Sequence, residues 1–198
     1  MGDSWTSRVG YVIGVQFGGV GMPTSIAVIE RMRHVVDDQP QPTTYGVVHL
    51  HQAQGPYTDQ IDVLHRLRSA LLPAKHSPSL IADLTAVGRP VAKELRKAGI
   101  HSCNVSVSEG ANETGDGDFN FSIPRNNLGS ALAVVLDAGR LRIAKDMPAA
   151  SALAAELESA RDGAIGGLSL PVALVTWWCE RKASVPLHII NNLFGSIS

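Results

Sequence analysis

The sequence predicts an α/β fold with a mixed central sheet, in which three antiparallel strands are followed by parallel strands and flanking helices. Two observations predict it. The N-terminal quarter alternates β-rich segments with turns rich in glycine and proline. After it, segments with the 3.6-residue helical period alternate with short apolar runs, as in chains whose helices connect parallel strands.

The N-terminal part is predicted to form two consecutive hairpins. Residues 9–17 (VGYVIGVQF) are β-rich and bounded by glycines, which indicates a buried strand. The turn GGVGMP at 18–23 leads to a second strand at 24–34. The segment DDQPQP at 37–42 contains two prolines and is predicted to be the second turn, before a third strand at 44–52. Connections this short join antiparallel neighbours.

The rest of the chain is predicted to alternate helices and strands. Ile61 and the leucines after it follow helical spacing, and the apolar run at 79–85 (SLIADLT) is typical of a central parallel strand. Pro90 begins a helix that ends near Gly99. The later expectations are a strand in 101–110, a polar loop at 110–119, a helix at 127–138, a short extended piece at 141–144, and helices at 147–162 and 164–181.

This order, β-β-β-α-β-α-β followed by helices, is the ribonuclease H-like topology. We therefore expect a ribonuclease H-like fold with a central sheet flanked by helices. The 198 residues contain no internal repeat and no composition change typical of a linker, so residues 1–198 are predicted to form a single domain.

Composition argues against several classes of protein. The 17 basic and 18 acidic residues leave a net charge of −1, which argues against a uniformly basic nucleic-acid surface and leaves a local basic patch open. The N-terminus has no apolar signal core, and the longest apolar stretch is too short to span a bilayer. The two cysteines, Cys103 and Cys179, fit reduced thiols better than a disulfide. We expect a cytoplasmic protein without a membrane segment.

Four segments in order resemble the nuclease domain of phage terminase large subunits, the motors that package and cut viral DNA. They are YVIGVQFGGVGMPTSIAVIER, LIADLTAVGRPVAKELRKAGI, the stretch from IPRNNLG to LESARD that includes GRLRIA, and RDGAIGGLSLPVALVTWW. Together they cover about residues 9–180. The phosphate-binding loop G-x-x-x-x-G-K-[ST] of that family's ATPase domain does not occur, so no ATPase domain is expected.

The resemblance implies a two-metal phosphodiester hydrolase, in which a carboxylate cluster holds Mg²⁺ or Mn²⁺. The family's acidic positions are only partly acidic here. Asp83 keeps the fourth-strand acid and Asp162 keeps the first acid of the last motif. The other motif positions differ from the family. Gln16 replaces the first-strand acid, and Met22 replaces a second acid after it. In the later motifs, Ala86 replaces a glycine, Arg161 replaces a histidine and Gly163 replaces the last acid.

The replacement of the first-strand acid by Gln16 has the largest consequence. An amide oxygen can coordinate a metal but carries no charge, and nearby unit charges interact by roughly 4 kcal/mol at an effective dielectric of 20. Met22 is a poor ligand for Mg²⁺, and Arg161 would add positive charge if it pointed inward.

Structural roles for the surviving acids stay open. Asp83 could satisfy a loop or cap a helix, Asp162 could be a helix N-cap, and Glu30 is either a solvated strand-end acid or a substitute ligand. The remaining candidates are expected to be solvated: the strand histidines His49 and His51, and the loop acids Glu109, Glu113, Asp116 and Asp118.

Two functional hypotheses follow. The first is a catalytically degenerate, terminase-nuclease-like domain of phage origin that acts as a binding or structural module. The second is a metal-dependent DNA endonuclease with a site rebuilt around Asp83 and Asp162. The missing acids favour the first. Mg²⁺ or Mn²⁺ is expected only with the second, and DNA and phage packaging proteins are the partners that the resemblance implies.

Overall fold

The computed structural model describes residues 2–72, 78–116, 119–160 and 164–183. These residues form eight strands and five helices. The strands are β1 (Trp5–Gln16), β2 (Thr24–Val36), β3 (Gln39–Ala53), β4 (Ser79–Asp83), β5 (Cys103–Ser108), β6 (Thr114–Gly115), β7 (Asn120–Pro124) and β8 (Leu141–Ile143). The helices are α1 (Tyr57–Leu71), α2 (Arg89–Lys97), α3 (Arg125–Asp137), α4 (Ala150–Ala160) and α5 (Ser169–Ala183).

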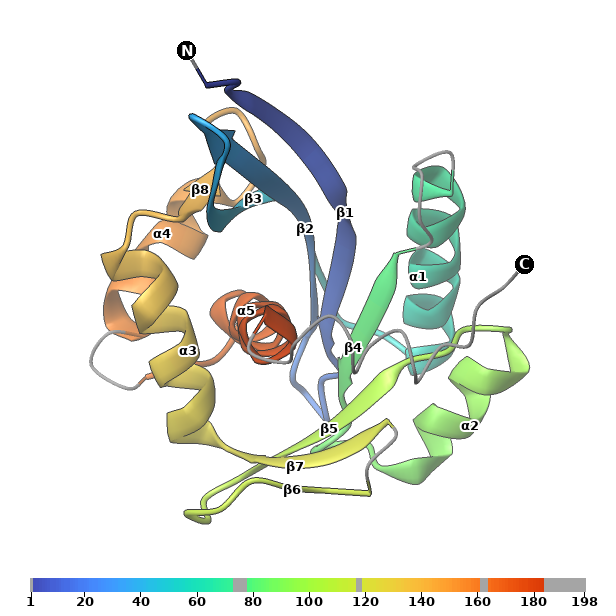
Figure 1. The fold of residues 1–198 in the computed structure, drawn as a ribbon. Coiled ribbons are helices and arrows are strands. Elements are labelled where there is room, and N and C mark those ends of the chain that lie inside the picture. Colours follow the sequence, from blue (N-terminus) through green and yellow to red (C-terminus); the bar gives the residue numbers. More distant parts are fainter. Residues whose placement is uncertain (1, 73–77, 117–118, 161–163, 184–198) are drawn as a thin grey trace.

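The strands form one mixed sheet in the order β6-β7-β5-β4-β1-β2-β3-β8 (Figure 1). β1, β2 and β3 are consecutive antiparallel neighbours. β4 pairs with β1 in parallel, and β5 and β7 continue the parallel half. This arrangement confirms the predicted ribonuclease H-like fold, because the fourth strand returns beside the first and places the two halves of the sheet next to each other.

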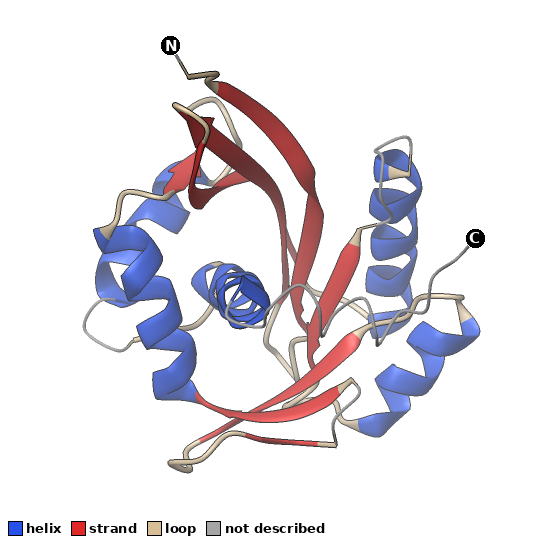
Figure 2. Ribbon diagram, viewed as in Figure 1, coloured by secondary structure: helices blue, strands red, loops and turns tan. Residues whose placement is uncertain are grey.

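Helices cover both faces of the sheet (Figure 2). The sheet therefore separates two hydrophobic cores, and alternate residues of β1 point into one or the other. Ile13 belongs to the core beneath α1 and α2, and Val12 belongs to the core beneath α5. α3 and α4 cover the outer side of α5, which explains why every residue from 168 to 179 is buried. No helix among the described residues is long and apolar enough to cross a membrane.

The contact between α5 and β1 is made at Gly14. A Cβ atom added to Gly14 would lie 2.2 Å from the Pro171 carbonyl oxygen, so only glycine allows the helix backbone to approach the strand this closely. Pro171 lies in the first turn of α5, where a missing N–H leaves no helical hydrogen bond unmade. The helix begins at Ser169 rather than at the predicted residue 164.

The second predicted turn is shorter than expected. Only Asp37 and Asp38 form it, both with positive φ (48° and 62°), as a two-residue hairpin requires. The prediction that 37–42 is a turn is therefore wrong, because Pro40 and Pro42 lie within β3. Among the described residues, β8 joins the outer edge of β3 only at residues 45–47 and no strand pairs with the edge before them, where proline is tolerated.

The predicted loop at 110–119 also contains structure. β6 lies within it, and β7 follows directly and pairs with β5 in parallel. β7 is five residues long and was not predicted, because its sequence NFSIP carries too short a pattern to identify a strand.

A polar cluster fixes the C-terminal end of α5 to the edge of the sheet. Arg140 donates to both carboxylate oxygens of Glu180, at 2.9 and 2.8 Å, and Tyr45 donates to the same carboxylate. Tyr45 is 1% exposed, and burial raises the pKa of its hydroxyl. The hydrogen bonds from Arg140 lower the pKa of Glu180 below its usual range.

We expect Gly14→Ala to lower the free energy of unfolding by about 2 kcal/mol or more, because the new methyl group would collide with the α5 backbone. Gly46→Ala in β3 is the matched control, since the nearest atoms to its added Cβ lie at 4.0 Å, and we expect a change within about 1 kcal/mol. Urea denaturation measures both. Equal effects of the two substitutions would contradict the close approach at Gly14.

Glu180→Gln is expected to destabilise the protein by about 1–3 kcal/mol at pH 7, because it leaves the Arg140 guanidinium without its countercharge. The folded-state pKa of Glu180 is lowered, so its stabilisation is present above the unfolded pKa of about 4.3 and is lost as pH falls. The difference in free energy of unfolding between Glu180→Gln and the unaltered protein should therefore shrink below about pH 4. Glu94→Gln, which removes the carboxylate of the surface pair with Lys97, is the control. An equal, pH-independent loss of stability in the two variants would contradict the role of Glu180.

Candidate functional site

Two predicted site residues end neighbouring strands. Gln16 is the last residue of β1 and Asp83 the last of β4, and the two are register partners in the parallel pair. Both side chains point to the α5 face, because Val12 and Ile81, at even spacing from them, belong to the core beneath α5. The carboxyl ends of β1 and β4 thus bring Gln16 and Asp83 together, where α/β proteins commonly bind ligands.

The same row continues across the antiparallel strands. Ser25 of β2 pairs with Gln16, and Gln52 of β3 pairs with Ser25. The Gln52 side-chain amide donates to the Ser25 hydroxyl at 3.0 Å. We call Asp83, Gln16, Ser25 and Gln52 the polar row. It spans four strands and contains one carboxylate.

Asp83 is buried and already engaged. Its side chain accepts hydrogen bonds from the Thr85 backbone N–H, at 2.9 Å, and from the Thr85 hydroxyl. The Thr85 hydroxyl in turn accepts from the Val107 N–H at 2.7 Å, which ties the loop after β4 to β5. Asp83 therefore satisfies this loop, one of the two structural roles considered for it. Burial raises the pKa of Asp83, and the Thr85 hydrogen bonds and the Arg125 charge only partly oppose that rise.

Arg125 supplies a positive charge near Asp83. It is the first residue of α3, donates to the Ile165 carbonyl oxygen at 2.8 Å, and pairs with Glu109 at 3.2 Å. The Glu109 side chain is 84% exposed, so that ion pair is a weak competitor for the guanidinium. Sequence reasoning missed Arg125, because nothing in its neighbourhood marks it and only the path of β7 brings it to this place.

The third predicted site residue cannot be placed. Asp162, together with Arg161 and Gly163, lies outside the described residues. Its convergence with Gln16 and Asp83 stays a prediction. The segment that follows it is held near the site, because Ile165 binds Arg125.

The other candidates lie away from the polar row. Glu30 pairs with Arg8 and is five residues from Ser25 along β2, about 16 Å, so it is not a substitute ligand. His49 and His51 pair with Val28 and Ile26, whose side chains face α1. Across the described residues, no group of three or more His, Cys, Asp or Glu side chains could hold a metal ion.

Met22 and Glu113, both in loops, lie in different surroundings. Met22 is 64% exposed at the tip of the β1–β2 loop. Glu113, predicted to be solvated, instead accepts from the Trp177 indole N–H at 3.1 Å and pairs with Arg181. Glu113 thereby fastens the 110–116 segment to α5.

No protein-family model and no curated protein matches this sequence. Among solved structures, the chain is similar to RuvC of Thermus thermophilus, at 12% sequence identity and a TM-score of 0.41, over 88% of this chain and 97% of that one. A likeness at this level carries no inference about activity. The fold follows from the strand order and pairing described above.

Asp83→Asn is expected to stabilise the protein at pH 7, with a rise in melting temperature of about 2–5 °C. Asparagine keeps an oxygen that accepts from Thr85 and removes the buried charge. The folded-state pKa of Asp83 is raised, so its favourable contribution is present below the unfolded pKa of about 3.9 and is lost as pH rises. The rise in melting temperature caused by Asp83→Asn should therefore disappear near pH 3. Asp62→Asn, at an exposed position, is the control. A lower melting temperature of Asp83→Asn at pH 7 would contradict the prediction that the buried Asp83 charge destabilises the fold.

Proposed function

We propose that this chain is a catalytically degenerate ribonuclease H-like domain, related to the terminase nuclease domain, which acts as a binding or structural module. The observation that carries the proposal is the polar row. It lies at the carboxyl ends of β1, β3 and β4 and the amino end of β2, but three of its four members are neutral.

The described residues do not fit a two-metal site. Two divalent cations held a few ångströms apart repel each other, and a cluster of anionic ligands is needed to offset that repulsion. Here Asp83 is the one carboxylate of the row, and it is 4% exposed and engaged by Thr85. The Arg125 charge acts on the same carboxylate and further disfavours a cation beside it.

A metal-dependent DNA endonuclease with a rebuilt site around Asp83 and Asp162 is the second candidate. One contact favours it. Arg125 binds the Ile165 carbonyl oxygen, which holds the chain only three residues after Asp162 on the side of the sheet where Asp83 lies. Under this alternative the cofactor would be Mg²⁺ or Mn²⁺ and the substrate DNA. Under the first proposal, the partners are DNA or phage packaging proteins bound without cleavage, in the cytoplasm.

The unaltered protein is expected not to nick supercoiled plasmid in Mg²⁺ or Mn²⁺, because one engaged carboxylate does not assemble the metal pair. Gel electrophoresis of the plasmid over time measures this. Cleavage that disappears in Asp83→Asn would reject the degenerate site and favour the rebuilt one.

Restoring charge should restore metal binding. We expect Gln16→Asp combined with Arg125→Gln to raise Mn²⁺ affinity at least tenfold in titration calorimetry, and the further change Gly163→Asp to raise it again. Gln16→Asp combined with Arg66→Gln, a change of an exposed α1 arginine, is the matched control for net charge. Equal Mn²⁺ affinities for the two double variants would show that Arg125 does not oppose a cation at this site.

A further inference from the structure

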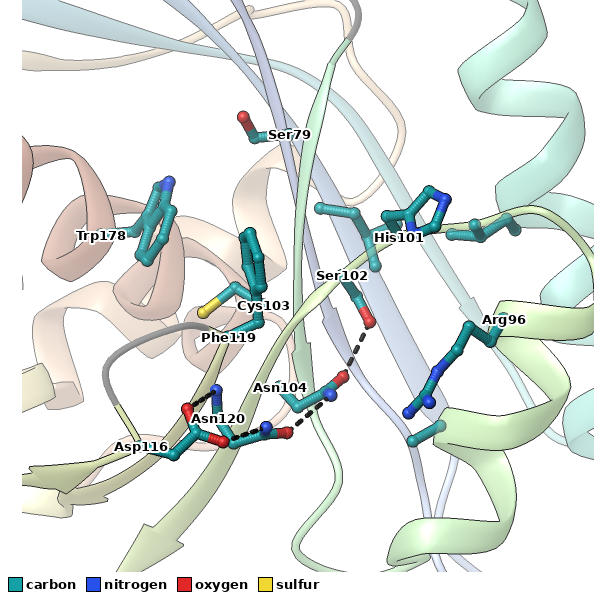
Figure 3. A pocket seen from close by; sticks show the side chains of 13 residues that line it. Ser79, Arg96, His101, Ser102, Cys103, Asn104, Asp116, Phe119, Asn120 and Trp178 are labelled. Carbon is teal, nitrogen blue, oxygen red and sulfur yellow. Dashed lines mark hydrogen bonds between the residues drawn. The ribbon is translucent and has the colours of Figure 1, made fainter. Parts of the chain in front are cut away.

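A pocket lies at the opposite end of the parallel strands from the polar row. It is a pocket of about 520 Å³, within the range of small-molecule sites, and Ser79, the first residue of β4, lines it (Figure 3). Asp83 ends the same strand four residues later, about 13 Å away along β4. The pocket is therefore separate from the polar row.

One side of the pocket is aromatic. Phe119 lines it with 53% of its surface exposed. Trp178 of α5 forms the wall behind it and is held edge-on against Phe121, with ring centroids 6.2 Å apart. The exposed Phe119 ring can stack on a planar ligand, while the fixed Trp178 keeps the wall rigid.

The other side of the pocket is cationic. Arg96, in the last turn of α2, and His101, in the loop after it, line this side (Figure 3). None of the ion pairs formed by the described residues uses either side chain. The Arg96 guanidinium extends toward Asn104 in Figure 3, and a guanidinium is suited to bind a phosphate group.

A hydrogen-bonded chain of polar side chains joins the two sides. The Ser102 hydroxyl donates to the Asn104 oxygen at 2.7 Å, the Asn104 amide donates to the Asn120 oxygen at 2.9 Å, and the Asn120 amide donates to Asp116. These bonds fix both amides in place. Each amide nitrogen keeps a second hydrogen and each amide oxygen a second lone pair, which can serve the edge of a heterocycle.

We propose that this pocket binds a nucleoside monophosphate, with its base against Phe119 and its phosphate at Arg96. The lining sets this orientation, because Arg96 lies on the opposite side of the pocket from Phe119 (Figure 3). The same chemistry is offered by a free nucleotide and by the 5′-phosphorylated end of a single strand. The site is independent of the proposed function, since it uses no residue of the polar row.

Titration calorimetry with AMP, CMP, GMP and UMP tests the proposal, with each nucleoside and inorganic phosphate alone as separate arms. At least one nucleotide should bind at least tenfold more tightly than its nucleoside or phosphate. Arg96→Gln should reduce nucleotide affinity at least tenfold and leave nucleoside affinity unchanged. Phe119→Ala should reduce the affinity for both nucleotide and nucleoside.

Matched controls are Lys93→Gln, which removes an exposed charge from the same helix, and Val134→Ala, which removes an exposed apolar side chain from α3. Both should leave nucleotide affinity unchanged, and thermal melting verifies that every variant folds. A 5′-phosphorylated tetranucleotide that binds more tightly than the mononucleotide, with the same Arg96 dependence, would identify a strand end as the source. No binding of any nucleotide at millimolar concentration, or binding insensitive to both Arg96→Gln and Phe119→Ala, would overturn the proposal.

Discussion

The close approach of α5 to β1 at Gly14 is the constraint on which the rest of the structure depends. Because the strand has no side chain there, the helix backbone lies directly on the sheet, and its apolar side chains fill the space around it. Gly14 is two residues before Gln16 on the same face. The contact therefore holds the first turn of α5 against β1, a few residues after Ile165, which binds Arg125.

The charges at the carboxyl ends of β1 and β4 are the basis of the proposed function. Parallel strands that end together can collect carboxylates from distant parts of the chain, but this chain supplies Asp83 alone in the polar row. Thr85 occupies that carboxylate and burial disfavours its charge. The positive charge of Arg125 also acts on this carboxylate, which disfavours a cation beside it.

The two ends of the parallel strands differ in chemistry. The carboxyl ends of β1 and β4 carry the neutral Gln16 and the buried Asp83, whose carboxylate Thr85 engages. At the amino ends, an exposed aromatic ring, fixed amides and a cationic side surround a pocket. Open α/β sheets usually bind ligands at the carboxyl ends of their strands. The pocket described above lies at the amino ends of β4, β5 and β7.

The sequence by itself determined the first four strands, the helices that follow helical spacing, and the presence of Gln16 and Asp83 at strand ends. These features depend on neighbours within a few residues, such as alternation, glycine turns and Pro90. Only the tertiary structure decided that Pro40 and Pro42 lie in a strand, that β7 exists, and that Arg125 lies near Asp83. Each of these depends on which segments become neighbours in space, because an unpaired sheet edge tolerates proline and a partner strand stabilises a segment whose own pattern is too short.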